Sequence, residues 1–169
     1  LFAQPFDLLL GRKTYEIFAA HWPYVEKDDP IGPLFDRIDK YVATRNPAFK
    51  TTWQNSHVLG ADTIAAVKTL KSEDGPDLLT QGSTEFLKAL FEQDLVDEVH
   101  ISVFPVILGK GKRLFGDASF PRALTLIGSE TSNSGIVMSK YARAGDVTTG
   151  SFEFETPTGA EIERRRNLT

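Results

Sequence analysis

Residues 6–14 read FDLLLGRKT, a short apolar run that stops at a glycine and continues into two cations. A run of this length favours a buried β-strand over Phe6 to Leu10, because a helix would need more residues. A helix is predicted from Thr14 to Ala20. The turn Gly11-Arg12-Lys13-Thr14 between them offers free backbone N–H groups, the positive end of a helix dipole and two cationic side chains. Such a turn suits a phosphate group.

A plainer interpretation of the same turn stays open, in which Thr14 caps the helix and Arg12 and Lys13 are solvated. The turn is not a Walker A loop, because the earlier glycine of that motif is absent. It also lacks the G-x-G-x-x-G fingerprint of dinucleotide-binding folds. Phosphate binding and simple capping are therefore both compatible with these four residues.

Further along the chain, short apolar runs alternate with amphipathic segments, a pattern typical of an α/β fold. Strands are predicted over residues 40–44, 56–59, 77–81, 99–104, 124–130 and 136–144, and helices over 62–71 and from 82 onward. The polar segment 131–135 joins the last two strands as a hairpin, 25–33 and 108–112 are loops, and 151–155 is an edge strand. We predict a single domain over residues 1–155 and a frayed polar tail over residues 156–169.

The composition restricts the classes of function that the chain can have. Its 169 residues suffice for one domain, and a net charge of -4 argues against general binding to nucleic acid or acidic membranes. The absence of cysteine excludes disulfides, thiolate catalysis and cysteine-based metal sites. His21, His57 and His100 lack metal-ligand spacing, so no metal is expected. No apolar run reaches the roughly 18–20 residues of a membrane span and no signal peptide is visible, so we expect a cytoplasmic protein without a membrane partner.

A second strand-to-helix turn has the same character as the first. Gln81-Gly82-Ser83-Thr84 combines a glycine that permits close backbone approach with two hydroxyls at a predicted helix start. The alternative is a plain capped helix, with Glu85 closing a capping box. Thr44 and Arg45 follow a third predicted strand and add a cation. Because open sheets bind ligands at the carboxyl ends of their strands, the three strand ends are candidates for one shared site.

Four segments of the chain carry a resemblance to a known family. They are LGRKTYE at 10–16, VATR at 42–45, QGS at 81–83 and LVDEVHISVFPVILGKG at 95–111, the last followed by KRLF. In order and spacing they resemble the dihydrofolate reductase-like superfamily, and most closely the RibD C-terminal family, the reductase domain of riboflavin biosynthesis. The likeness extends from residue 6 to about residue 141, and the fourth segment is the most specific.

The resemblance implies a mixed central sheet flanked by helices and ending in a C-terminal β-hairpin, with NADPH as cofactor. It implies that the turn from Gly11 to Thr14 holds the cofactor pyrophosphate. Arg12, with Thr44 and Arg45, is expected beside the adenosine 2′-phosphate. The residues Gln81, Gly82, Ser83 and Thr84 are expected to close over the pyrophosphate toward the nicotinamide. Arg12, Lys13 and Arg45 are also the cations that a 2′-phosphate needs, and no acidic residue replaces them.

The chain departs from the family pattern in two places. Gln81 stands where the family usually has the first glycine of a pair. The family's first strand, the loop after it and much of its first helix have no counterpart, so we expect the N-terminal strand to be absent from the chain. That region carries the acidic residue near the substrate in dihydrofolate reductase, and we therefore assign no catalytic residue. For the substrate, Ser102 matches a substrate-side hydroxyl, and Tyr15 is a candidate for a planar pocket. The plainer interpretation is that Ser102 is an ordinary serine of a strand and that Tyr15 is an aromatic residue of the core.

The expected function is hydride transfer from NADPH to a small heterocyclic or sugar-imine or carbonyl acceptor, of the 5-amino-6-(5-phosphoribosylamino)uracil reductase type. A non-catalytic NADP(H)-binding or oligomeric regulatory module is the alternative from another class. A dihydrofolate or pterin reductase is a further alternative, disfavoured because no arginine after the first helix is placed to bind a folate glutamate. The expected partner is a small molecule, and the resemblance carries the expectation of a homodimer.

Overall fold

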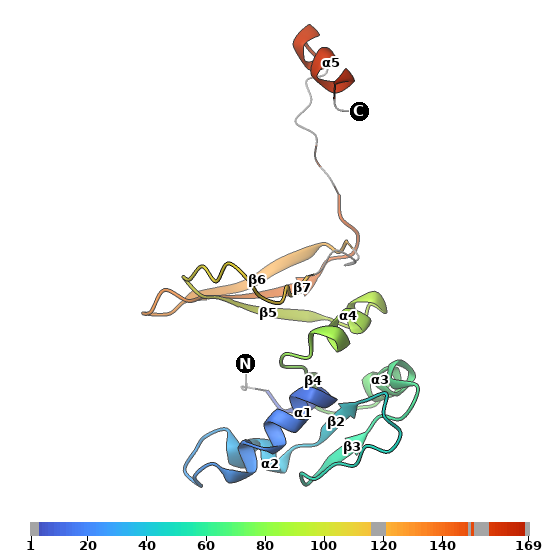
Figure 1. Ribbon diagram of the computed structural model, residues 1–169, viewed down its shortest axis with the longest axis vertical. Coiled ribbons are helices and arrows are strands. Elements are labelled where there is room, and N and C mark those ends of the chain that lie inside the picture. The colour runs from blue at the N-terminus through green and yellow to red at the C-terminus, as the bar shows by residue number, and fades with distance from the viewer. Residues whose placement is uncertain (1–3, 116–120, 149, 151–155, 168–169) are drawn as a thin grey trace.

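The computed structural model describes residues 4–115, 121–148, 150 and 156–167, and its strands form two separate sheets (Figure 1). The first is parallel, with the order β3-β2-β1-β4, and the second is antiparallel, with the order β5-β7-β6. The strands are β1 (Phe6–Gly11), β2 (Lys40–Ala43), β3 (Ser56–Val58), β4 (Asp77–Leu79), β5 (Glu98–Val103), β6 (Leu124–Thr131) and β7 (Val137–Arg143). The α/β fold class is confirmed, although parallel and antiparallel strands do not share one continuous sheet.

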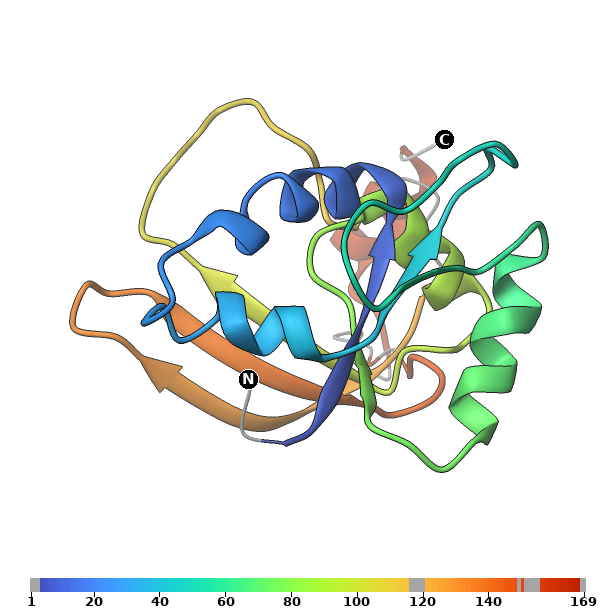
Figure 2. The same cartoon turned by 90° about the horizontal axis from the view of Figure 1, so that it is seen from below.

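Helices cover both faces of the parallel sheet (Figure 2). They are α1 (Arg12–Ala19), α2 (Gly32–Arg37), α3 (Thr63–Ser72) and α4 (Thr84–Glu92), with a short 3₁₀-helix at Trp22–Tyr24. β1 is buried on both faces, and its side chains alternate between them. Phe6, Leu8 and Leu10 pack with α1 and α2, whereas Leu9 packs with α3 and α4. The apolar run FDLLL is therefore the central strand of the core.

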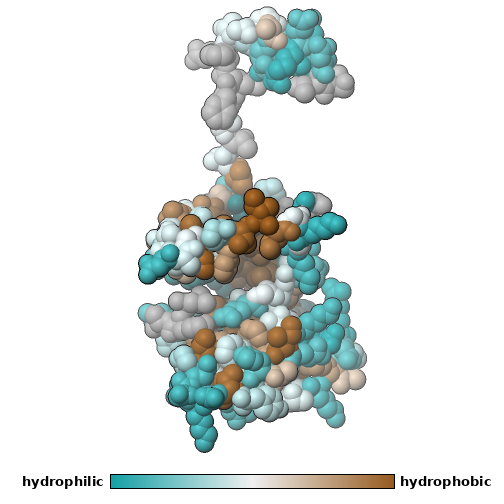
Figure 3. Space-filling model, turned by 60° about the vertical axis from the view of Figure 1, so that its left-hand side comes forward, coloured by the Kyte–Doolittle hydropathy of each residue, from teal (hydrophilic) through white to brown (hydrophobic). Residues whose placement is uncertain are grey.

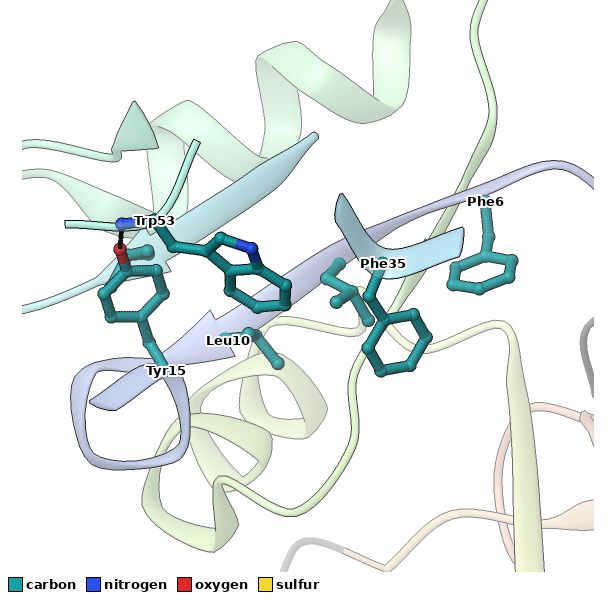
Figure 4. Close-up of a cluster of buried hydrophobic side chains, with 7 residues drawn as sticks. Phe6, Leu10, Tyr15, Phe35 and Trp53 are labelled. Carbon is teal, nitrogen blue, oxygen red and sulfur yellow. Dashed lines mark hydrogen bonds between the residues drawn. The ribbon is translucent and has the colours of Figure 1, made fainter. Parts of the chain in front are cut away.

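An aromatic cluster fills the space between β1, α1 and α2 (Figure 4). Phe6 meets Phe35 edge to face at 6.2 Å between ring centroids. Tyr15 and Trp53 lie 6.5 Å apart, and Figure 4 shows the Tyr15 hydroxyl directed at the backbone nitrogen of Trp53. Aromatic pairs prefer particular orientations, so they stabilise this packing arrangement beyond the burial of apolar area alone.

Three predictions about local structure are wrong. Residues 32–33, expected in a loop, begin the six-residue helix α2. Thr14 is the third residue of α1 rather than its cap, because α1 begins at Arg12. The tail, expected to be frayed, contains α5 (Gly159–Arg166), in which Glu161 pairs with Arg164 and Arg165. Figure 1 shows α5 standing apart from both sheets. The predicted edge strand 151–155 lies outside the described residues.

The antiparallel sheet and the loop that follows its strand β5 leave much apolar surface in contact with solvent. All eight residues of β6 are exposed, and Ile107 in the loop after β5 is 99% exposed. Figure 3 shows apolar side chains gathered on this part of the molecule. Within the described residues, no helix is both long enough and apolar enough to cross a membrane.

Candidate functional site

The first and second predicted turns meet at the carboxyl ends of β1 and β4, which are neighbouring strands. The backbone N–H of Gly11 donates a hydrogen bond to Ser83 Oγ at 2.9 Å. Ser83 Oγ in turn donates to Thr14 Oγ1, also at 2.9 Å. One serine hydroxyl therefore joins two turns that are about seventy residues apart in the sequence.

The backbone of the second turn explains why Ser83 reaches across to the first. Gly82 and Ser83 both have left-handed backbone angles, with φ of 67° and 56°. An ordinary N-cap residue is extended and points its side chain back at its own helix, but the Ser83 side chain makes no such bond to α4. The capping-box alternative for this turn is therefore wrong, and the hydroxyl serves α1 instead.

Gly11 permits the close approach of the two turns. A Cβ atom at this position would lie 3.2 Å from Ser83 Oγ and 3.3 Å from Ser83 Cβ, which is tighter than most Cβ contacts. The glycine is thus required by the neighbouring turn rather than by its own backbone, which is extended at φ -70°.

Two helix N-termini lie beside each other at this point. Neither α1 nor α4 has a side-chain cap; the first turn of α1 contains no acidic residue, whereas the first turn of α4 contains Glu85. The first N–H groups of a helix have no partner within the helix, and together with the helix dipole they attract negative charge. The joined turns are therefore an arrangement that favours an anion, and a phosphate above all.

The third predicted turn reaches the same edge of the sheet. Ala43 at the end of β2 pairs with Gly11, so Thr44 and Arg45 leave the sheet next to the start of α1. Thr44 Oγ1 accepts a hydrogen bond from Asn46 N at 3.1 Å, and Arg45 is exposed. The three strand ends that the sequence nominated thus belong to three adjacent strands, β2, β1 and β4.

The cations at this edge differ in their surroundings. Arg12 forms a 2.6 Å ion pair with Glu16, one turn further along α1. Lys13 and Arg45 are exposed to solvent. Glu16 is a residue that the sequence-based prediction missed, although its i,i+4 spacing from Arg12 is the usual signal for such a pair.

The two candidate substrate residues are not brought to this site. Tyr15 is 1% exposed, and its hydroxyl accepts hydrogen bonds from the backbone N–H groups of Thr52 and Trp53. It is a core residue without surface for a substrate, so that assignment is corrected. Ser102 is exposed on β5, opposite Met138 in the antiparallel sheet, apart from the joined turns.

No group of three or more histidine, aspartate or glutamate side chains with the geometry to hold a metal ion occurs within the described ranges. The groups that the joined turns and the third turn bring together are backbone N–H groups, hydroxyls and cations.

Comparison with known proteins identifies what the chain is similar to. A sequence model of the RibD C-terminal domain matches residues 1–138. The uncharacterized protein YyaP of Bacillus subtilis (strain 168) is 30% identical over 138 residues, which cover 79% of this chain and 72% of that protein. The uncharacterized protein YwjB of the same strain is 31% identical over 139 residues, covering 81% and 73%.

Solved structures show the same fold. A protein of Shewanella sp. PV-4, whose name assigns it provisionally to riboflavin biosynthesis, matches with a TM-score of 0.64 at 20% identity, over 84% of this chain and 75% of that one. A pyrimidine reductase-like protein of Corynebacterium diphtheriae has a TM-score of 0.59 at 13% identity, over 84% and 77%. RibD of Acinetobacter baumannii has a TM-score of 0.56 at 14% identity, over 83% of this chain and 47% of that one.

Proposed function

We propose that this chain, which belongs to the RibD C-terminal domain family, is an NADPH-dependent reductase acting on a small heterocyclic or sugar-imine or carbonyl acceptor. The family provides a riboflavin-biosynthesis-type reductase fold. The observation that carries the proposal is the junction of the α1 and α4 N-termini through Ser83, with Arg12 and Lys13 on α1 and Arg45 just after β2.

The donor set at the junction fits a phosphorylated dinucleotide. The uncapped N–H groups of α1, the Thr14 hydroxyl and the start of α4 at Thr84 would hold the pyrophosphate. Arg45, with Arg12 and Lys13, would hold the 2′-phosphate. A site for NAD instead needs a carboxylate that binds the ribose hydroxyls. Glu16 is paired with Arg12, so Arg12 would exchange this partner for the 2′-phosphate, whereas Lys13 and Arg45 are exposed.

When bound, NADPH supplies the hydride, and the chain's own residues bind and orient the cofactor. In this proposal the turn at Gln81 and Gly82 borders the nicotinamide side, as the family resemblance implies for the second turn. We propose an acceptor of the 5-amino-6-(5-phosphoribosylamino)uracil reductase type, supported by the family and by the likeness to a pyrimidine reductase-like protein. No residue is assigned as proton donor.

A non-catalytic NADP(H)-binding module is the second candidate, and it is favoured because neither substrate candidate lies at the joined turns: Tyr15 is buried, and Ser102 belongs to the antiparallel sheet. Titration of NADPH fluorescence followed by an acceptor screen separates the two functions. We expect NADPH to bind at micromolar concentration and to be oxidised with a pyrimidinone acceptor. Binding without oxidation by any pyrimidinone or pterin would favour the binding module, and no binding at micromolar concentration would refute both.

A further inference from the structure

A lysine ammonium lies in the core of the parallel sheet. Lys40, the first residue of β2, is 0% exposed and is flanked by β1 and β3. Its Nζ donates to the carbonyl oxygens of Phe35 at 2.7 Å and Asp36 at 3.3 Å. These carbonyls lie at the end of α2, where they have no partner within the helix. Burying an amine is costly unless it is hydrogen-bonded, and this one is.

The same ammonium lies over an aromatic ring. Lys40 Nζ is 4.3 Å from the centroid of the Trp53 ring, within the range of a cation–π contact. Trp53 Nε1 donates to Asp36 Oδ1 at 2.5 Å, so the indole is held at both its face and its edge. Lys40 of β2 and Asp36 of α2, which we call the Lys40 corner, therefore both contact the Trp53 side chain.

Tyr15 of α1 also contacts the part of the chain around Trp53. Its hydroxyl accepts from Thr52 N at 2.9 Å and from Trp53 N at 2.8 Å, and the second of these hydrogen bonds is drawn in Figure 4. Its ring meets Phe49 edge to face. Residues 49–55, which we call the pinned segment, are thus fixed between α1 and the Lys40 corner. Tyr15 directly follows Thr14 of the joined turns.

The pinned segment continues from the loop that carries Arg45. Between them the hydrogen bonds are local: Asn46 N to Thr44 Oγ1, Ala48 N to Asn46 Oδ1 at 3.0 Å, and Phe49 N to Asn46 O at 3.2 Å. Arg45 is therefore positioned by two supports, the end of β2 before it and the pinned segment after it.

We propose that Lys40 is a positioning residue of the site, which fixes the pinned segment through Trp53 and thereby sets where Arg45 lies beside α1. This inference rests on the proposed function, in which Arg45 binds the 2′-phosphate. Lys40 is too deeply buried to touch a ligand, and it acts through Trp53.

The charges around Lys40 keep the ammonium form available. Asp36 on α2, Asp39 before β2 and Asp7 on β1 all favour the charged amine. Burial is the larger effect and lowers the pKa of Lys40 to about 8. The amine is therefore mostly protonated at neutral pH, as the contact with the Trp53 ring requires.

The test compares Lys40→Met, which keeps an unbranched side chain one atom shorter and removes its charge, with Lys50→Met. Lys50 is an exposed lysine of the same segment and is the matched control. Dissociation constants for NADPH and NADH are measured on the full chain. Trp53 emission is followed in a Trp22→Phe background, because the chain has two tryptophans.

We expect Lys40→Met to weaken NADPH about tenfold, the equivalent of one charge-assisted contact, and NADH less than about twofold. Trp53 emission should change, and Lys50→Met should change neither quantity. A merely structural role would weaken both nucleotides equally, and that result would overturn the proposal. Unchanged NADPH binding would overturn it as well.

Two further measurements keep the proposal testable. If Lys40→Met does not fold, Trp53→Phe should show the same preference for weakening NADPH, and wild-type binding by that variant would overturn the proposal. If the unmodified protein does not bind NADPH, the proposed function fails separately. Hydrogen exchange at the Thr52 and Trp53 amides then tests the part of the proposal that does not depend on NADPH: faster exchange in Lys40→Met than in Lys50→Met supports the fixing of the pinned segment by Lys40, and equal exchange refutes it.

Discussion

Strand β1 of the parallel sheet and strand β6 of the antiparallel sheet differ completely in the exposure of their residues. In β1 every residue from Phe6 to Leu10 is buried, whereas in β6 every residue from Leu124 to Thr131 is exposed. Burial of apolar surface is the main source of stability, so we expect the parallel sheet with its helices to be the more stable half of the described structure. The joined turns lie at the edge of that half. A site that must hold several N–H groups in fixed positions benefits from such a support.

The largest expected difference between the two sheets is in the stability lost when a leucine is truncated, in β1 of the parallel sheet or in β6 of the antiparallel sheet. Leu8 in β1 is 0% exposed and Leu126 in β6 is 55% exposed. We expect Leu8→Ala to lower the free energy of unfolding by about 2–5 kcal/mol, because it leaves a cavity. Leu126→Ala should lower it by about 1 kcal/mol or less. Urea unfolding of both variants checks this, and similar losses would show that the antiparallel sheet is equally well packed.

The second prediction concerns the buried charge of Lys40 in the parallel sheet, which makes the free energy of unfolding depend on pH. The pKa of Lys40 is lowered by burial from 10.5 to about 8, so between these values the unfolded chain binds more protons than the folded one. The free energy of unfolding should therefore rise by about 1–3 kcal/mol from pH 8 to pH 10. Chemical denaturation at several pH values measures it. Lys40→Met should remove the rise, and a variant that keeps it would assign the effect to another group.

The third difference compares two glycines. A Cβ at Gly11 would crowd Ser83, whereas one at Gly128 in β6 would lie 3.9 Å from Lys140 Cβ, an ordinary contact. Gly11→Ala should cost about 1–3 kcal/mol through overpacking and weaken NADPH, since the two turns are pushed apart. Gly128→Ala should stay within about 0.5 kcal/mol of the parent. Thermal melts and NADPH titrations distinguish the variants, and a Gly11→Ala protein that binds NADPH normally would argue against the junction as the site.

The smallest expected effect comes from an ion pair on the antiparallel sheet. Glu98 and Lys140 are 2.7 Å apart and about half exposed, and the hydrogen bond from Lys140 lowers the pKa of Glu98. The stabilisation is present above the usual carboxyl pKa and is lost as the pH falls below it. Glu98→Gln should cost no more than about 0.5 kcal/mol at neutral pH, because solvent screens exposed pairs. A loss comparable with that of Leu8→Ala would contradict the contrast between the two halves.

Local signals in the sequence predicted most of the elements. The run FDLLL, the N-cap Asp62 of α3 and the strands on either side of residues 131–135 were all found from short windows, and the structure confirms them. α2 was missed because its six residues include a glycine and a proline, and no period emerges over so short a helix.

Only part of the candidate site could be predicted from such local signals in the sequence. Each turn is a local signal, so Gly11 and Gly82 could be nominated separately. Their junction depends on the left-handed backbone of Ser83, which propensity does not predict for a serine. The burial of Tyr15 follows from tertiary contacts with residues near position 52, which a window around the first turn does not contain.

The hydrogen bond from Gly11 to Ser83 also has a consequence for the order of folding. It spans 72 residues and joins the first described strand to the last helix of the parallel half. Contacts this distant in sequence form only after the intervening chain has been organised, since closing a long loop costs entropy before any contact is gained. A nascent chain that ends before α4 thus displays the complete phosphate-friendly turn of α1 without its partner. Nucleotide binding would then report that β1 to α4 have assembled, and a bound nucleotide would favour the assembled state by mass action.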